Sequence, residues 1–129
     1  MIRRAERKAG NLRNARFVQG DVSSLDFPDT CFDTIVDFAI LHHVPDWRNA
    51  LSELHRTLKI GGEFLFEDLA VETWEQGVGI PSRVIADHPY DEMFRKLEFV
   101  DEPVRLGFDV RESRPLSLYY FWGCAEKMA

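Results

Sequence analysis

Acidic and histidine side chains follow the apolar runs of this sequence, where they could act on a bound small molecule. Asp37 is the penultimate residue of one such run, and His42 and His43 come shortly after it. A carboxylate there can orient an acceptor hydroxyl or amine, and an imidazole that titrates near neutrality can serve as a general base. Two interpretations stay open for each. Asp37 orients an acceptor or caps a loop. One histidine, with His42 the candidate, acts as the base, or one of the two is hydrogen-bonded beneath the turn and the other is solvated.

Two further carboxylates, Glu67 and Asp68, end a second apolar run, and either could contact a substrate. Adjacent side chains on a strand point to opposite faces, so this pair is not an acid/base site. His42 and His43 are adjacent on a turn, where we expect their side chains to diverge, and no nearby Cys or His completes a ligand set. No metal site is therefore predicted.

Alternating strand and helix patterns position these groups. The run Phe32–Phe38 is mostly apolar and partly β-branched, which predicts a strand covered on both faces. Asp46 precedes apolar residues at helical spacing and predicts a capped helix that ends at Gly61-Gly62. The other predicted elements are a helix over 2–9, strands over 15–19 and 63–69, short helices over 91–97 and 102–106, and extended runs over 109–114 and 116–125.

This order of elements predicts an α/β fold. Strand, helix and strand alternate through the first half, which is typical of a mostly parallel sheet. The two extended runs at the end predict a C-terminal antiparallel hairpin added to its edge. No repeat, low-complexity tract or linker divides the chain, so residues 1–129 are predicted to form a single domain.

The composition excludes several classes of protein. Of 129 residues, 45% are hydrophobic and 29% charged, and no apolar run reaches the ~20 residues that span a bilayer, so no membrane partner is predicted. The net charge of −6 argues against nucleic acid as a partner, although the first 16 residues carry +5 and the remainder −11. Only Cys31 and Cys124 are present, which predicts no disulfide framework and a cytoplasmic protein.

Four segments resemble the class I S-adenosylmethionine-dependent methyltransferases, in that family's order and spacing. They are Phe17-Val18-Gln19-Gly20-Asp21-Val22, Phe32-Asp33-Thr34-Ile35-Val36, Leu41-His42-His43-Val44 and the run from Glu53 to Gly62. The last resembles the family's "LKPGG" turn, with Ile60 in place of the proline. The resemblance covers residues 1–70 and implies a partial Rossmann-like methyltransferase sheet and methyl transfer to a small-molecule acceptor.

The resemblance also implies roles for individual residues. Asp21 would accept a hydrogen bond from the adenine amino group of S-adenosylmethionine, and the Val22 N–H would meet a ring nitrogen; the alternative is that Asp21 caps its own turn. Asp37 and Phe38 would face the transferring methyl group. The segment Asp37-Phe38-Ala39-Ile40 is not the Asp-Pro-Pro-Tyr type that acts on the exocyclic amines of bases. This difference favours a small-molecule acceptor.

One departure from the family pattern limits what the resemblance implies. The family's glycine-rich loop, and the acidic residue that ends its second strand, have no counterpart in these 129 residues. The sequence therefore resembles an N-terminally truncated methyltransferase, for which weak binding of S-adenosylmethionine is expected. Two alternatives stay open: a non-catalytic remnant of the fold that acts as a binding or interaction module, or a coding sequence whose true start lies upstream.

The same departure predicts self-association. In the family the two missing strands lie between the strand at 15–19 and the strand at 32–38. Without them, the edge of the strand at 32–38 has no neighbour and can pair with another chain. We therefore expect a homodimer, unless the strand at 15–19 pairs with the strand at 32–38 in the same chain.

Overall fold

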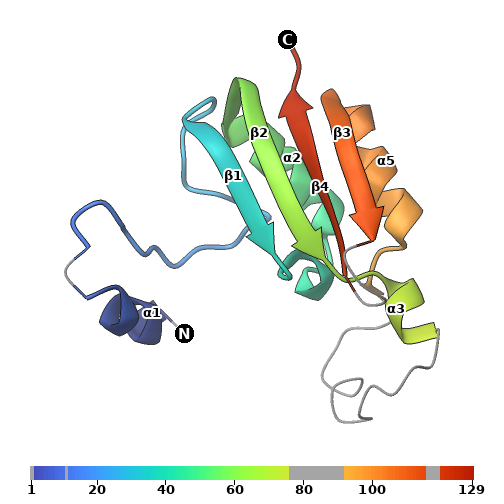
Figure 1. The fold of residues 1–129 in the computed structure, drawn as a ribbon. Helices are drawn as coiled ribbons and strands as arrows, with labels where there is room; N and C mark the ends of the chain where they lie inside the picture. The colour runs from blue at the N-terminus through green and yellow to red at the C-terminus, as the bar shows by residue number, and fades with distance from the viewer. Residues whose placement is uncertain (1, 11, 76–91, 116–119) are drawn as a thin grey trace.

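A four-stranded sheet forms the centre of the molecule, in the order β1-β2-β4-β3 (Figure 1). The structure is a computed structural model, and it describes residues 2–10, 12–75, 92–115 and 120–129. Its elements are α1 (Ile2–Ala9), β1 (Phe32–Phe38), the 3-10 turn η1 (Leu41–His43), α2 (Trp47–Thr57), β2 (Leu58–Asp68), α3 (Val71–Glu75), α5 (Lys96–Leu106), β3 (Phe108–Pro115) and β4 (Phe121–Lys127).

The sheet confirms the predicted α/β class and the antiparallel pair at its end. β1 and β2 run parallel, whereas β4 runs antiparallel to both β2 and β3. The parallel part described by the structure is therefore the single β1–β2 pair. The predicted bounds of β1 and of α1 match those of the structure.

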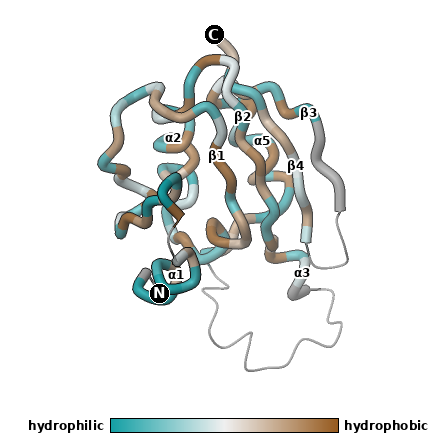
Figure 2. Tube along the Cα trace, turned by 60° about the vertical axis from the view of Figure 1, so that its left-hand side comes forward, coloured by the Kyte–Doolittle hydropathy of each residue, from teal (hydrophilic) through white to brown (hydrophobic). Residues whose placement is uncertain are grey.

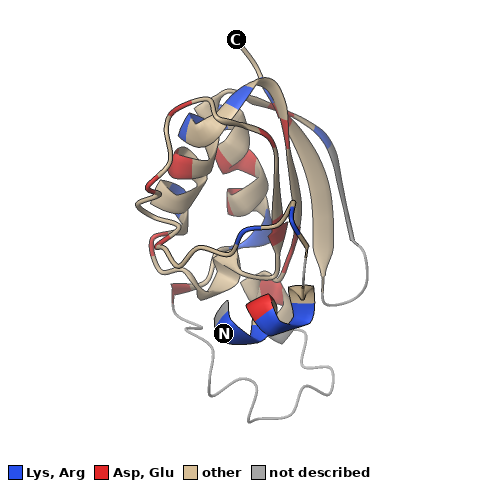
Figure 3. Ribbon diagram, turned by 90° about the vertical axis from the view of Figure 1, so that its left-hand side faces the viewer, with Lys and Arg blue, Asp and Glu red and all other residues tan. Residues whose placement is uncertain are grey.

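Helices α2 and α5 lie on one face of the sheet and contact each other there (Figures 1 and 3). The Oδ1 of Asp46 accepts the Asn49 N–H and caps α2, as predicted. The helix ends at Thr57 and not at Gly61-Gly62, because the chain is already extended at Leu58. Gly62 instead serves a close approach within the sheet, since a Cβ there would stand 2.9 Å from the Asp33 carbonyl oxygen. No helix in the described part of the chain has the length and apolar character needed to cross a bilayer.

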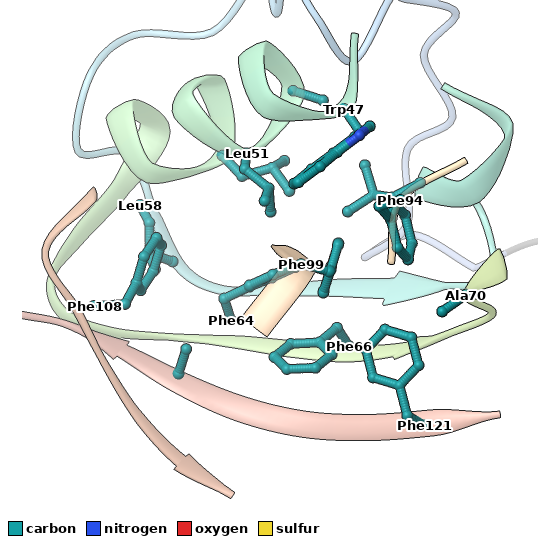
Figure 4. Close-up of a cluster of buried hydrophobic side chains, with 14 residues drawn as sticks. Trp47, Leu51, Leu58, Phe64, Phe66, Ala70, Phe94, Phe99, Phe108 and Phe121 are labelled. Atoms are coloured by element: carbon teal, nitrogen blue, oxygen red, sulfur yellow. The ribbon is translucent and has the colours of Figure 1, made fainter. Parts of the chain in front are cut away.

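An aromatic core fills the space between the sheet and the two helices (Figure 4). Phe99 of α5 is fully buried, and its ring centroid lies 5.3 Å from that of Phe66 on β2 and 4.4 Å from that of Phe94. Trp47 of α2 closes this group from the other side, 5.3 Å from Phe94. The face that α2 and α5 cover, called here the covered face, thus carries the main hydrophobic core.

The opposite face of the sheet has no helix over it in the described part of the chain (Figures 1 and 2). On this open face Val36 is 51% exposed, Phe38 67% and Leu65 37%. The sequence predicted that β1 is covered on both faces, and for the described residues this prediction is wrong. Apolar side chains on β1 and β2 consequently face outward.

The prediction of a strand over residues 15–19 is also wrong. Residues 14–20 form no ladder, and Phe17 and Val18 are 40% and 52% exposed. A strand needs a neighbouring strand to receive its hydrogen bonds, and no described strand lies beside this segment. The outer edge of β1 therefore has no ladder partner among the described residues.

The two short helices predicted over 91–97 and 102–106 form a single helix, α5, which begins at Lys96. Pro103 lies inside it, and Gly107 ends it in the left-handed conformation with φ 99°. The single helix is possible because Phe99 and Pro103 share one buried side, four residues apart. Asp91 and the connection at 116–119 lie outside the described residues.

Candidate functional site

The carboxyl ends of β1 and β2 meet at one end of the parallel pair, and each brings an aspartate to the covered face. Asp37 on β1 is 7% exposed, and Asp68, the last residue of β2, is completely buried. Asp37 pairs with Phe66 in the ladder, so the two aspartates lie on the same face of neighbouring strands, two residues apart in register. In open α/β sheets ligands bind beside the carboxyl ends of parallel strands.

Asp68 is the centre of a buried polar cluster. Its Oδ1 accepts the Leu69 N–H at 2.7 Å, and its Oδ2 accepts the His42 N–H at 3.3 Å. The Nδ1 of His42 contacts Asp68 Oδ1 at 2.5 Å. Both side chains are almost entirely excluded from water, which makes such a contact strong and costly to break. Asp68 therefore ties the turn after β1 to the end of β2.

Asp37 is held less completely. Its Oδ1 accepts the Ile40 N–H at 3.3 Å, whereas its buried Oδ2 has no hydrogen-bond partner within the described chain. Burial, followed by the nearby Asp68 carboxylate, raises the pKa of Asp37 from 3.8 to about 8. Burial also raises the pKa of Asp68, to about 6, against the backbone N–H groups of Leu69 and His42, whose hydrogen bonds lower it. At neutral pH Asp37 is thus the protonated member of the pair.

The two histidines differ in burial. His42 is 3% exposed and hydrogen-bonded beneath the turn, whereas His43 is exposed. Their ring centroids are 4.0 Å apart, so the expectation that the two side chains diverge is wrong. Within the described residues, no group of three or more His, Cys, Asp or Glu side chains comes together as a metal site would require.

The backbone between these groups is strained. Ala39 has φ 52°, a left-handed conformation that costs a residue with a Cβ about 1 kcal/mol or more. Its N–H donates to the Glu67 carbonyl oxygen at 2.7 Å. On either side of it, Phe38 and Ile40 are 67% and 53% exposed. The strained turn therefore presents two apolar side chains to solvent above a buried acidic pair.

A groove of about 340 Å³ runs along the open face beside this turn. Its walls include the half-exposed Val36, Phe38 and Leu65, with Trp122 of β4 and the carboxylate-bearing Glu67. The groove is largely apolar, and the acidic residues among its walls are Asp37 and Glu67, which suits an apolar small molecule with a polar group.

Asp21 and Val22 lie on a separate loop that is fastened to α2. The Oδ1 of Asp21 accepts the Ser23 N–H at 2.9 Å, as in the alternative in which Asp21 caps its own turn. Val22 packs against the core. The same loop lines a second cavity, of about 590 Å³, with Gly20, Val22 and Phe27 among its walls.

The loop is held in place by an arginine. Arg56 of α2 donates to Glu53 Oε1 at 2.8 Å, to the Phe27 carbonyl oxygen at 2.9 Å and to Asp29 Oδ1 at 2.6 Å. The Leu25 N–H completes the contact by donating to Glu53 Oε2 at 2.9 Å. The helix thus fixes the loop that carries Asp21.

Of the five residues predicted for the site, the structure brings Asp37 and His42 together around Asp68, with Phe38 on the opposite face of the same strand. Asp21 and Val22 belong to the separate loop on α2. The sequence analysis named Asp68 only as a residue that could contact a substrate and missed that it holds His42. The available signal was its position, because it alternates inward with Phe64 and Phe66 on β2.

Comparison with known proteins agrees with this arrangement. Residues 1–66 match the family model described as a methyltransferase domain. The chain is 40% identical over 62 residues to demethylmenaquinone methyltransferase of Staphylococcus epidermidis, which covers 48% of this chain and 26% of that protein. It is 34% identical over 87 residues to fatty-acid O-methyltransferase of Mycolicibacterium smegmatis, covering 64% of this chain and 29% of the relative. The chain thus spans less than a third of the length of either relative.

Among solved structures, the fold is similar to that of 1,6-didemethyltoxoflavin-N1-methyltransferase of Burkholderia thailandensis, whose structure contains S-adenosylhomocysteine. The TM-score is 0.67 at 19% identity, over 98% of this chain and 56% of that one. This likeness concerns the fold, whereas the family model covers just over half of the sequence. The order of the strands and the position of the site at their carboxyl ends agree with that match. The chain therefore belongs to the methyltransferase domain family.

Proposed function

We propose that this chain carries the adenine side and the acceptor side of a site for S-adenosylmethionine-dependent methyl transfer to a small molecule. The observation that carries the proposal is the turn at the carboxyl end of β1. There a strained Ala39 presents Phe38 and Ile40 to solvent, next to Asp37, which is buried on the other face of the strand. Backbone strain of this kind persists where the surrounding structure enforces it and is concentrated at functional sites.

The residues of the loop fit the adenosyl part of S-adenosylmethionine. Val22 and Phe27 give the cavity apolar contacts for a planar base, and Gln19 and Asp26 add polar groups to its walls. Asp21 is exposed, and within the described chain only its Oδ1 accepts a hydrogen bond, which leaves Oδ2 for the adenine amino group. When bound, the cofactor supplies an electrophilic methyl group on a sulfonium. Asp21 and Val22 would hold the adenine base of the cofactor, and Phe38, at the end of β1, would cover the cofactor.

Asp37 and His42 then act on the acceptor side. Both side chains are buried, Asp37 at 7% and His42 at 3% exposure, which favours a positioning role over direct proton removal from an acceptor. Alignment of acceptor and methyl donor is the main requirement of an in-line displacement. We assign Asp37 and His42 the task of fixing the turn against which that alignment occurs.

The acceptor is proposed to be an apolar small molecule. The groove beside the turn is lined by Val36, Phe38, Leu65 and Trp122, and Glu67 adds one carboxylate that could orient a hydroxyl or amine. The relatives named for a menaquinone precursor and for fatty acids support an acceptor of this chemical class. The net charge of −6 makes nucleic acid an unsuitable acceptor.

The experiment that tests the proposal is titration of the isotope-labelled 129-residue chain with S-adenosylhomocysteine, followed by amide NMR. We expect weak binding, in the range above micromolar, with shifts of the Val22 and Ala39 amides. Asp21→Asn should weaken binding at least tenfold, because an amide in that position loses the charge-assisted hydrogen bond. Asp33→Asn, an exposed substitution of the same kind on β1, should leave it unchanged. Absence of shifts at millimolar ligand would favour the alternative, a non-catalytic binding or interaction module.

We further propose that the chain forms a homodimer in the cytoplasm. The outer edge of β1 has no ladder partner among the described residues, and Val36 and Phe38 are exposed on the same strand. Pairing of β1 with β1 of a second copy about a two-fold axis would satisfy the edge and shield these side chains. The helix α1 is basic, whereas the rest of the chain is acidic, so α1 of one copy would be attracted to the other copy (Figure 3). The basic residues of α1 are Arg3, Arg4, Arg7 and Lys8. Cys31 and Cys124 are not joined in a disulfide, which agrees with a reducing compartment.

Light scattering over a range of concentrations tests the dimer. A mass of about 30 kDa that falls on dilution supports it, because the single chain has a mass of 15.0 kDa. A constant mass of one chain up to high micromolar concentration would exclude it.

A further inference from the structure

The cluster of Asp37, His42 and Asp68 places two carboxyl groups and one imidazole in a space closed to water. Asp68 already receives N–H groups from Leu69 and His42 and contacts the His42 ring. Asp37 receives only the Ile40 N–H, and its second oxygen is buried without a donor. Two adjacent ionised carboxylates in such a space repel each other, and a buried anion lacking a hydrogen bond is costly.

One additional proton removes both difficulties. A proton on the Asp37 carboxyl neutralises one of the two anions. It also converts Asp37 into a donor, and the Asp68 carboxylate, buried on the same face of the neighbouring strand, would be its acceptor. The remaining charge on Asp68 is then balanced by the donors of His42 and of the backbone.

We infer that Asp37 and Asp68 share one proton and that this proton, together with His42, fixes the position of the turn from Phe38 to His43. Asp68 acts here as a positioning residue, since it holds the turn through His42. When Asp37 gives up its proton to solvent at higher pH, the two carboxylates repel each other, and the link between Asp37 and Asp68 that holds the turn is lost.

The groups that act on Asp37 come from two elements. β2 contributes Asp68, and the turn contributes His42 with His43 stacked on its ring. The neighbouring strand β4 and helix α2 add the uncharged Phe121 and Trp47 to the adjoining core. Among the described residues the shared proton is therefore governed by the carboxyl pair and the histidine.

This inference concerns the turn and does not require methyl transfer; only its consequence for the cofactor rests on the proposed function. Phe38 and Ile40 leave their positions when the proton is lost, so cofactor binding would weaken at the same pH. The decisive measurement is made on the ligand-free chain, so that failure of the cofactor proposal leaves it standing.

The test follows the amides of Ile40 and Leu69 by NMR from pH 5 to pH 10. In the wild-type chain, the chemical shifts of both amides should change along one titration curve with a midpoint near pH 8. In Asp37→Asn the side-chain amide supplies the donor at every pH, so this titration should disappear. Asp33→Asn, an exposed aspartate on the same strand, should retain the wild-type midpoint.

Thermal unfolding gives a second measurement. Because the pKa of Asp37 is raised on folding, the proton's contribution to stability is complete below pH 4 and is lost as the pH rises to about 8. The unfolding temperature of Asp37→Asn relative to wild type should therefore rise between pH 5 and pH 8, by roughly 5 °C or more. Flat Ile40 and Leu69 amides in wild type, or an unchanged midpoint in Asp37→Asn, would overturn the inference. The wild-type titration decides alone if the variant fails to fold.

Discussion

Each of the two faces of the sheet has one place at which the usual distribution of side chains is reversed. On the covered face, β1 places Asp37 and β2 places Asp68 in the interior beside Phe64 and Phe66. On the open face, the same two strands expose Val36, Phe38 and Leu65. A purely structural strand would put its charges outside and its apolar residues inside.

This reversal indicates that both faces serve binding as well as folding. The buried carboxyls lie only at the strand ends, where the turn must be held, and the rest of the covered face is aromatic. The exposed apolar residues gather around the groove, where a ligand or a second chain would remove them from water. Stability is therefore expected to reside in the covered face and recognition in the open face.

The largest difference should come from removing one phenylalanine from each face. Phe66 is 3% exposed and contacts the rings of Phe64, Phe99 and Phe121, so Phe66→Ala should lower the free energy of unfolding by about 3–5 kcal/mol. Phe38→Ala, at 67% exposure, should change it by no more than ~0.5 kcal/mol. Urea unfolding measures both. Equal losses would show that the open face is also part of the stabilising core.

A smaller loss should follow from changing the buried lysine of the covered face. The Nζ of Lys127 donates to the carbonyl oxygens of His55 at 2.8 Å and Leu58 at 2.9 Å, at the end of α2. Lys127→Met keeps most of the side-chain volume but leaves both acceptors unpaired, which should cost about 1–3 kcal/mol. The control is Arg48→Met, whose guanidinium is half exposed and whose loss should cost ~0.5 kcal/mol or less. A neutral Lys127→Met would mean that water replaces the lost donor.

On the open face, a polar substitution should alter association and leave folding unchanged. Val36→Thr replaces an apolar side chain of β1 that is 51% exposed, so the free energy of unfolding of the monomer should change by less than about 1 kcal/mol. The dissociation constant of the dimer, measured by light scattering, should rise several-fold. The proposed pairing through β1 would be contradicted if association were unchanged while stability fell.

The smallest effect should be local, at the loop that holds Asp21. Hydrogen bonds from Arg56 and from the Leu25 N–H lower the pKa of Glu53 from 4.5 to about 2. The contact is thus complete above pH 4.5 and is lost as the pH falls toward 2. Glu53→Gln should abolish this acid-induced change and speed hydrogen exchange of the Leu25 amide at neutral pH. Unaltered exchange would show that Arg56 alone fastens the loop.

Local patterns were sufficient to predict the elements whose signals lie within a few residues. The bounds of β1 and α1 and the cap at Asp46 follow from apolar alternation, a glycine stop and a side-chain acceptor at the first turn. The strand at 15–19 was predicted wrongly, because local propensity does not reveal whether a neighbouring strand exists. For the same reason, the sequence could not show that β1 is uncovered on one face.

The candidate site was predictable in its residues but not in its connections. Asp37 and His42 were identified because they lie at and just after the end of an apolar run, and in the structure both lie near Asp68. Their link is Asp68, 26 residues beyond His42, and its direction is fixed only once the register of β2 against β1 is known. The protonation of Asp37 likewise depends on burial from several elements, which no sequence window contains.

The strand that comes last in the sequence occupies a middle position in the sheet. β4 (Phe121–Lys127) lies between β2 and β3, and its Lys127 also binds the end of α2. During synthesis on the ribosome, β1, α2 and β2 emerge first but must wait for this strand before the sheet can close. A nascent chain halted before residue 121 would hold β2 and β3 apart and offer both unpaired edges to chaperones.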